Sequence, residues 1–158
     1  MIDPGTNPDG EEYMAYNRRR WGGDGWTYSV RDCAQDLGCR FANWKWWPNT
    51  MNAHCLMELA EEQGKGMELK KRLLLLTYEE GANISDHAVL VKAAEDVGMQ
   101  GAAAFVSSGQ AKHTVVERHR YWSQYGVNGV PFFLVNNRHN VCGAPGARWF
   151  LKHFNSKQ

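Results

Sequence analysis

Between residues 48 and 125 the apolar residues recur every three or four positions, which is the spacing of one face of an α-helix. This pattern predicts helices at residues 50–63, 67–80, 85–97, 101–106 and 110–125. A glycine directly follows four of these five segments, where a left-handed turn commonly ends a helix. Asn49 and Thr50 precede the first helix and Ser85 opens the third, so their side-chain oxygens are expected to cap these helices.

The N-terminal part of the chain shows weaker periodicity. Residues 11–20 are expected to form a helix, because Asp9 and Glu12 have the spacing of a capping box. Residues 22–43 are rich in glycine, aspartate and serine, and we expect a long loop with one turn of helix near residues 29–35.

After residue 126 the period changes from that of helices to that of strands. Residues 132–135 and 140–142 are predicted to form the two strands of a β-hairpin, connected by residues 136–139. A last helix is expected at residues 145–154, with Pro145 in its first turn, where a missing amide hydrogen is harmless.

Composition and charge narrow the function classes. A length of 158 residues indicates one domain, and a net charge of +1 gives no broad basic surface for nucleic acid. The basic runs at residues 18–20 and 70–72 are interpreted as solvated helix faces. No apolar stretch reaches 18 residues, so no membrane span is predicted.

The four cysteines are not spaced like the disulfide framework of a small secreted domain. A reducing compartment, the cytoplasm or the interior of an organelle, is therefore favoured over secretion. Cys55 lies on an apolar helical stripe and is expected to be buried, and Cys142 is expected in the core. Cys33 and Cys39 are interpreted as free loop thiols, with a local disulfide as the alternative.

Four short motifs occur in an order that resembles the DsbA-like family of FrnE type, which is related to 2-hydroxychromene-2-carboxylate isomerases and kappa-class glutathione transferases. The motifs are Pro48-Asn49-Thr50-x-x-Ala53-His54, Gly81-x-x-Ile84-Ser85-Asp86, Ala94-x-x-Val97-Gly98 and Gly126-Val127-x-Gly129-Val130-Pro131-Phe132-Phe133. The resemblance implies an α/β fold of thioredoxin-like, DsbA type with a helical insertion. The whole chain is then one DsbA-like domain, with the insertion at about residues 9–125 and the C-terminal half of the thioredoxin fold at residues 126–158.

The chain departs from this family in one respect. The family begins with a strand, a helix that starts with Cys-x-x-Cys, and a second strand, whereas no Cys-x-x-Cys occurs in these 158 residues. The N-terminal βαβ half of the fold is therefore expected to be missing, which leaves the structure mostly helical with a C-terminal hairpin. We expect no catalytic residue in this chain, because dithiol exchange needs a paired, exposed thiolate.

The resemblance implies a site for substrate at Val130 and Pro131, where the family holds a cis peptide bond beside its active site. Asn49 and His54 match the family helix that faces the same cleft, although a helix cap and a structural histidine are the simpler roles. An aromatic run is interpreted as core or interdomain packing, with a peptide groove as the alternative; its members are Phe41, Trp44, Trp46 and Trp47. No metal site is predicted, since His113 and His119 lie six residues apart.

Three functions remain open at this point. The first is a DsbA- or FrnE-like thiol–disulfide oxidoreductase family member that lacks dithiol catalysis in this chain. The second is a non-catalytic subunit that pairs with a protein partner, or with itself, through an exposed edge of the sheet. The third is a glutathione-dependent isomerase or transferase, for which glutathione is the one possible cofactor.

Overall fold

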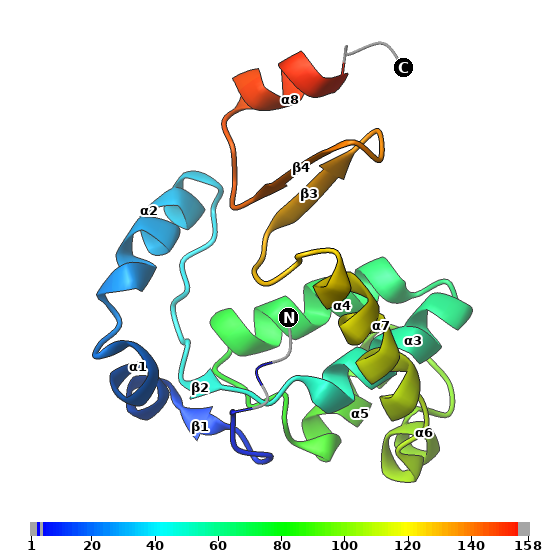
Figure 1. The fold of residues 1–158 in the computed structure, drawn as a ribbon. Helices are drawn as coiled ribbons and strands as arrows, with labels where there is room; N and C mark the ends of the chain where they lie inside the picture. Colours follow the sequence, from blue (N-terminus) through cyan, green and yellow to red (C-terminus); the bar gives the residue numbers. More distant parts are fainter. Residues whose placement is uncertain (1–2, 4, 155–158) are drawn as a thin grey trace. The chain divides into compact units, whose positions relative to one another are not determined.

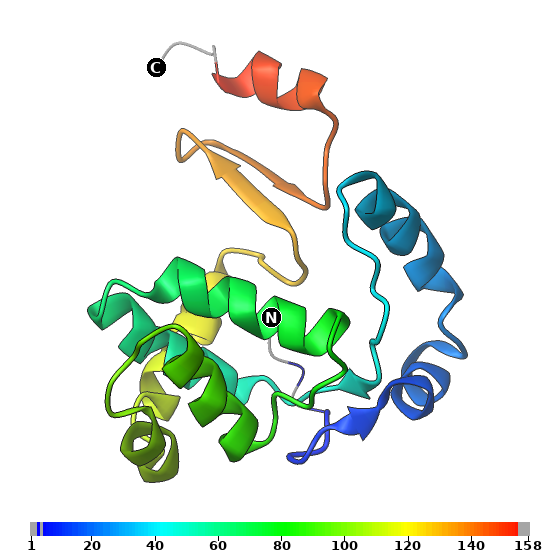
Figure 2. The ribbon, with the colours of Figure 1, turned by 180° about the vertical axis from the view of Figure 1, so that it is seen from behind.

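The computed structural model describes residue 3 and residues 5–154, and Figures 1 and 2 show it from opposite sides. The chain divides into two compact units, residues 2–115 and residues 116–158, and each is described by itself. Helix α7 (Lys112–Gln124) runs across the division. None of the helices in the described ranges is long and apolar enough to cross a membrane.

Four helices form the core of the first unit, as the periodicity predicts. These are α3 (Met51–Glu62), α4 (Gly66–Tyr78), α5 (His87–Asp96) and α6 (Ala102–Ser108), and they lie side by side in both views (Figures 1 and 2). Leu56, Leu69 and Leu90 are completely buried among them. Burying one such side chain contributes about 1.5–3 kcal/mol, so the shared core stabilises this packing.

Two of the predicted helix caps are wrong in detail. Helix α5 begins at His87, because the Asp86 carboxylate, not Ser85, accepts the capping hydrogen bond from the Ala88 amide at 2.8 Å. Thr50 precedes α3 without a side-chain capping bond. Asn49 fulfils its predicted role, since its side-chain oxygen accepts a hydrogen bond from the Met51 amide at 3.1 Å.

The N-terminal segment contains elements that the sequence did not indicate. Strand β1 (Glu11–Glu12) pairs with β2 (Trp46–Trp47) in an antiparallel sheet, with Glu11 opposite Trp47. Helix α1 (Tyr13–Trp21), which was predicted at residues 11–20, follows β1. Its cap is the Glu12 carboxylate, which accepts a hydrogen bond from the Ala15 amide at 2.7 Å. The predicted capping box of Asp9 and Glu12 is therefore wrong.

A second N-terminal helix, α2 (Tyr28–Asp36), follows a 3₁₀ turn at Gly25–Thr27 and occupies much of the predicted loop. None of its residues is buried. Helical periodicity is recognised from a stripe of apolar residues that the fold buries, so a helix without such a stripe gives a weak sequence signal.

The second unit contains the predicted hairpin. Strands β3 (Phe132–Val135) and β4 (His139–Cys142) are antiparallel, with Phe132 opposite Cys142, and helix α8 (Ala147–Phe154) follows two residues later than predicted. The ring of Phe133 meets that of Phe150 on α8 edge to face, at 4.9 Å between centroids. Cys142 is exposed, not buried as predicted, because side chains alternate along β4 and Cys142 shares the exposed face with Asn140.

Candidate functional site

The loop that leads into β3 contains the first pair of predicted site residues. The Val130–Pro131 peptide bond is cis in the structure. The Pro131 carbonyl accepts a hydrogen bond from the Gly143 amide at 2.8 Å, which ties the loop to the residue after β4. Val130 is 66% exposed, and among the described residues neither its amide nor its carbonyl forms a hydrogen bond.

An exposed thiol lies beside this loop. A methyl group placed on Gly129 would come within 3.2 Å of the Cys142 sulfur, so the two residues are in close contact across the hairpin. The sequence signal for Cys142 was misleading, because a cysteine at the end of an apolar strand is typical of a core position.

The second pair of predicted site residues lies on the first unit. Every polar group of Asn49 other than its carbonyl is used within that unit: its amide donates to the Ser85 hydroxyl at 2.7 Å, and its side-chain nitrogen donates to the Thr6 carbonyl at 3.2 Å. Its side-chain oxygen caps α3, as described above. Asn49 therefore holds three segments together. His54 lies one turn into α3 and is half-buried.

The aromatic run near residue 44 is part of a larger cluster in the first unit. Trp44 contacts several of its rings at centroid distances between 4.7 and 6.4 Å. The members are Tyr13, Tyr16, Trp21, Trp26, Phe41, Trp44, Trp47 and Tyr78. Trp46 joins through its carbonyl, which accepts a hydrogen bond from the Trp44 indole at 3.0 Å. The rings mainly contact one another, which is the packing role predicted for the run.

Arg31 lies at the centre of this cluster and was missed from the sequence. Its guanidinium is 5.4 Å from the Trp44 ring centroid, and it donates to the Phe41 carbonyl at 3.1 Å and to the Tyr13 hydroxyl at 3.3 Å. Contacts of a cation with aromatic faces contribute up to about 2 kcal/mol when partly desolvated. No local signal could have found Arg31, because it lies in the segment expected to be a loop.

The four thiols differ in accessibility. Cys55 on α3 is 4% exposed, and burial raises the pKa of its thiol, which makes it a poor nucleophile at neutral pH. The other three cysteines are exposed, and all four are free. Cys33 and Cys39 lie at the C-terminal end of α2, whereas a redox pair usually begins a helix.

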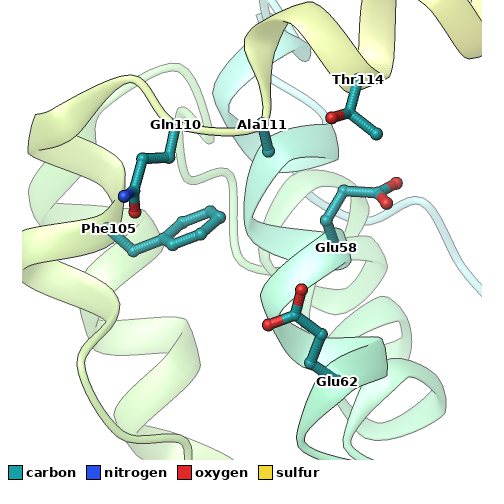
Figure 3. Close-up of a pocket in the computed structure, with 6 residues that line it drawn as sticks. All are labelled: Glu58, Glu62, Phe105, Gln110, Ala111 and Thr114. Atoms are coloured by element: carbon teal, nitrogen blue, oxygen red, sulfur yellow. The ribbon is translucent and has the colours of Figure 1, made fainter.

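A pocket of about 370 Å³ opens in the first unit between α3, α6 and the start of α7 (Figure 3). Its lining comprises Glu58, Glu62, Phe105, Gln110, Ala111 and Thr114. The lining contains two carboxylates but neither a thiol nor a histidine, so it offers no group for disulfide exchange. In residues 3 and 5–154 no cluster of three or more potential metal ligands occurs.

Comparisons with known proteins agree with this geometry. The model of the DSBA-like thioredoxin domain family matches residues 32–155. The uncharacterized protein YwbO of Bacillus subtilis is 28% identical over 164 residues, covering 100% of this chain and 75% of that protein. The crystal structure of a probable DsbA oxidoreductase from Streptomyces coelicolor superposes with a TM-score of 0.80 at 22% identity, covering 96% of this chain and 70% of that one. The fold thus has a counterpart among solved structures, and the chain belongs to the DSBA-like thioredoxin domain family.

Proposed function

We propose that this chain is a FrnE-type member of the family whose loop at residues 126–131 contacts a thiol or disulfide substrate, and that its own cysteines form no dithiol centre that catalyses exchange on this substrate. The observation that carries the proposal is the exposed Val130, whose backbone amide and carbonyl form no hydrogen bond among the described residues. An extended polypeptide can bind such a backbone by main-chain hydrogen bonds, while Val130 supplies an apolar contact.

The thiol arrangement supports the second part of this proposal. Disulfide exchange needs an exposed thiolate and a resolving thiol within reach. Cys55 is buried, and Cys33 and Cys39 are separated by five residues at the wrong end of a helix. Cys142 is exposed beside the loop, but it lies there as a single thiol in β4.

Asn49 and His54, the other residues for which the resemblance implies substrate contact, lie in the first unit. Because the polar side-chain atoms of Asn49 are used in holding α3 and its neighbours, we assign it the shaping of the helix start. For His54, one turn further along α3, substrate contact stays a prediction from the resemblance.

The test combines a binding assay with an activity assay. A labelled, carboxymethylated insulin B chain is titrated with the full chain, and binding is followed by fluorescence anisotropy. Val130→Lys should weaken binding about tenfold, because about 1.4 kcal/mol of apolar contact is lost. Val116→Lys is the matched control: Val116 is also an exposed valine, at 40%, on α7, and its substitution should leave the affinity unchanged.

The activity arm uses insulin reduction by a thiol donor. The chain should reduce insulin no faster than the donor alone. Rapid reduction that is abolished by Cys142→Ser would overturn the claim that the chain's own cysteines do not catalyse exchange, and it would identify Cys142 as a nucleophile. Equal losses of affinity in both valine variants would overturn the claim that the loop at residues 126–131 contacts the substrate. A rise in melting temperature with glutathione would instead support the glutathione-dependent alternative.

Protein association through β3 is a second candidate function. Within the described ranges β3 pairs with β4 alone, and its exposed Leu134 is apolar. The Pro131 carbonyl points toward β4, where it accepts a hydrogen bond from the Gly143 amide. Backbone groups along a strand point alternately to its two sides, so the amides and carbonyls of Phe132 and Leu134 point toward the unpaired edge. An apolar, unpaired edge is a template for another strand.

Light scattering after size-exclusion chromatography tests this candidate. The chain should elute as an assembly, and Leu134→Lys should convert it to a monomer, because a charged side chain on an edge opposes pairing. The substitution leaves the packing of Phe133 against Phe150 in place. A wild-type monomer at all concentrations, with slowly exchanging β3 amides, would contradict association through this edge.

A further inference from the structure

Helix α2 ends in a turn that folds the chain back along the helix. Gly38 has a positive φ of 79°, and its amide donates to the Gln35 carbonyl at 2.9 Å. The Cys39 amide donates to the Ala34 carbonyl at 2.8 Å. These two bonds define a Schellman motif, in which the residue after the left-handed glycine commonly contacts the side chain five or six positions earlier. For Cys39 these positions are Ala34 and Cys33.

Helix α5 ends in the same Schellman motif and shows where the motif places the residues equivalent to Cys33 and Cys39. It ends with the same pair of bonds, from Gly98 to the Glu95 carbonyl and from Met99 to the Ala94 carbonyl, both at 2.9 Å. Ala93 and Met99 occupy the positions that Cys33 and Cys39 occupy in α2, and both are buried in one hydrophobic cluster. The motif therefore brings these positions to the same side of the helix end.

We propose that Cys33 and Cys39 form a reversible intrachain disulfide, a redox site outside the substrate loop. The positions that share one apolar cluster in α5 hold two exposed, free thiols in α2. Exposure lets a soluble oxidant reach both sulfurs, and no other cysteine lies on this helix or in its terminal turn. The inference goes beyond the proposed function, since it requires neither Val130 nor a bound polypeptide.

The oxidant belongs to the class of low-molecular-weight disulfides, such as glutathione disulfide. The thiolate of one cysteine attacks this disulfide, forms a mixed disulfide and releases one glutathione thiolate, which takes up a proton. The second cysteine thiolate then attacks the protein sulfur of the mixed disulfide and releases the second glutathione. The protein loses two hydrogens in total, and the two electrons reduce glutathione disulfide to two thiols.

The disulfide would tie α2 to a segment that is already anchored. The amides of Arg40 and Phe41 donate to the Glu79 carboxylate at 3.0 and 2.8 Å, whereas α2 itself has no buried residue. Closing a short loop lowers the entropy of the open state, so amide exchange in α2 should slow by roughly tenfold or more on oxidation. The protein would thereby convert an oxidising environment into a more rigid N-terminal region.

The experiment uses the native full chain, equilibrated with glutathione and glutathione disulfide, alkylated and mapped by mass spectrometry. A peptide cross-linked between Cys33 and Cys39 is expected, while Cys142 carries glutathione and Cys55 stays reduced. Hydrogen exchange of the same samples should show the slower exchange of α2. Glutathione on both Cys33 and Cys39, or a cross-link that forms only in denaturant, would overturn the proposal.

A relocated thiol provides the matched control. The double variant Cys33→Ser with Val30→Cys moves the thiol of α2 from residue 33 to residue 30, which is also exposed. Residue 30 lies nearly one helical turn before residue 33, the position that the Schellman motif brings close to Cys39. Its cross-linking to Cys39 should be at least about tenfold less favourable, because that separation exceeds the reach of a disulfide. Equal cross-linking would refute the role of the Schellman geometry. Should this variant fail to fold, Cys39→Ser tests the same claim, since Cys33 should then retain glutathione.

Discussion

Replacing Gly81 by alanine should destabilise the first unit through one identifiable contact. Gly81 follows the end of α4 with a positive φ of 71°, and a methyl group there would lie 2.8 Å from the backbone carbonyl oxygen of Asn43. Asn43 is itself held against α4: its amide donates to the Tyr78 carbonyl and its side-chain nitrogen to the Glu80 carbonyl, both at 3.1 Å. The methyl group must therefore displace Asn43 from these bonds.

The expected loss is the sum of two effects. Holding an alanine in the left-handed conformation costs about 1–2 kcal/mol. Weakening two hydrogen bonds adds about 0.5–1.5 kcal/mol for each. Gly98→Ala is the matched control, because Gly98 has a φ of 75° after α5 but its methyl group would meet no other atom within 4 Å. Gly98→Ala should thus lower the free energy of unfolding by about 1–2 kcal/mol, and Gly81→Ala by at least about 1 kcal/mol more.

Urea denaturation followed by tryptophan fluorescence measures both values. Asn43 precedes Trp44 in the aromatic cluster, so Gly81→Ala should also change the near-ultraviolet circular dichroism, whereas Gly98→Ala should not. Equal destabilisation by the two substitutions would refute the contact between Gly81 and Asn43 as the cause.

Three further predictions concern pH, reactivity and the aromatic cluster. Burial and a hydrogen bond to Asp3 raise the pKa of Tyr16 from 10.0 to about 12, so stability should fall as pH rises through this interval, and Tyr16→Phe should reduce that fall in urea titrations. Cys55 should resist iodoacetamide until denaturant is added, while the three exposed cysteines react, as counted by mass spectrometry. Arg31→Lys should lower the unfolding free energy by roughly 1–3 kcal/mol in urea, since an ammonium cannot keep both the ring contacts and the bond to Phe41.

The sequence predicted most clearly the helices of the common core. Helices α3, α4 and α5 each place a completely buried leucine in the common core, and this requirement appears directly in the spacing of apolar residues. Helix α2 buries no residue, and β1 and β2 have two residues each, so neither produces a period that could be detected. Caps were harder to assign, because several capping side chains compete within two residues, as Ser85 and Asp86 do.

Some residues of the candidate site could also be located from the sequence, and others could not. Val130 and Pro131 could be located because their motif is local in sequence. Arg31 could not, since its partners Tyr13 and Trp44 are 18 and 13 residues away and meet it only in the folded unit. Cys142 was misplaced because burial on a strand depends on which face the alternation turns outward.

Substrate binding at Val130 and association through β3, the two activities that we propose for the second unit, should compete. A substrate chain at Val130 would continue along Phe132 and Leu134, whose backbone groups face the unpaired edge that an associating strand would also use. An isolated two-stranded hairpin is only marginally stable in water, so occupation of that edge by either chain should protect it. We therefore predict that saturating carboxymethylated insulin B chain shifts the assembly toward smaller species in light scattering. Leu134→Lys should weaken both interactions, whereas Val130→Lys should weaken substrate binding more than assembly. Peptide binding that leaves the assembly intact would show that the two surfaces are separate.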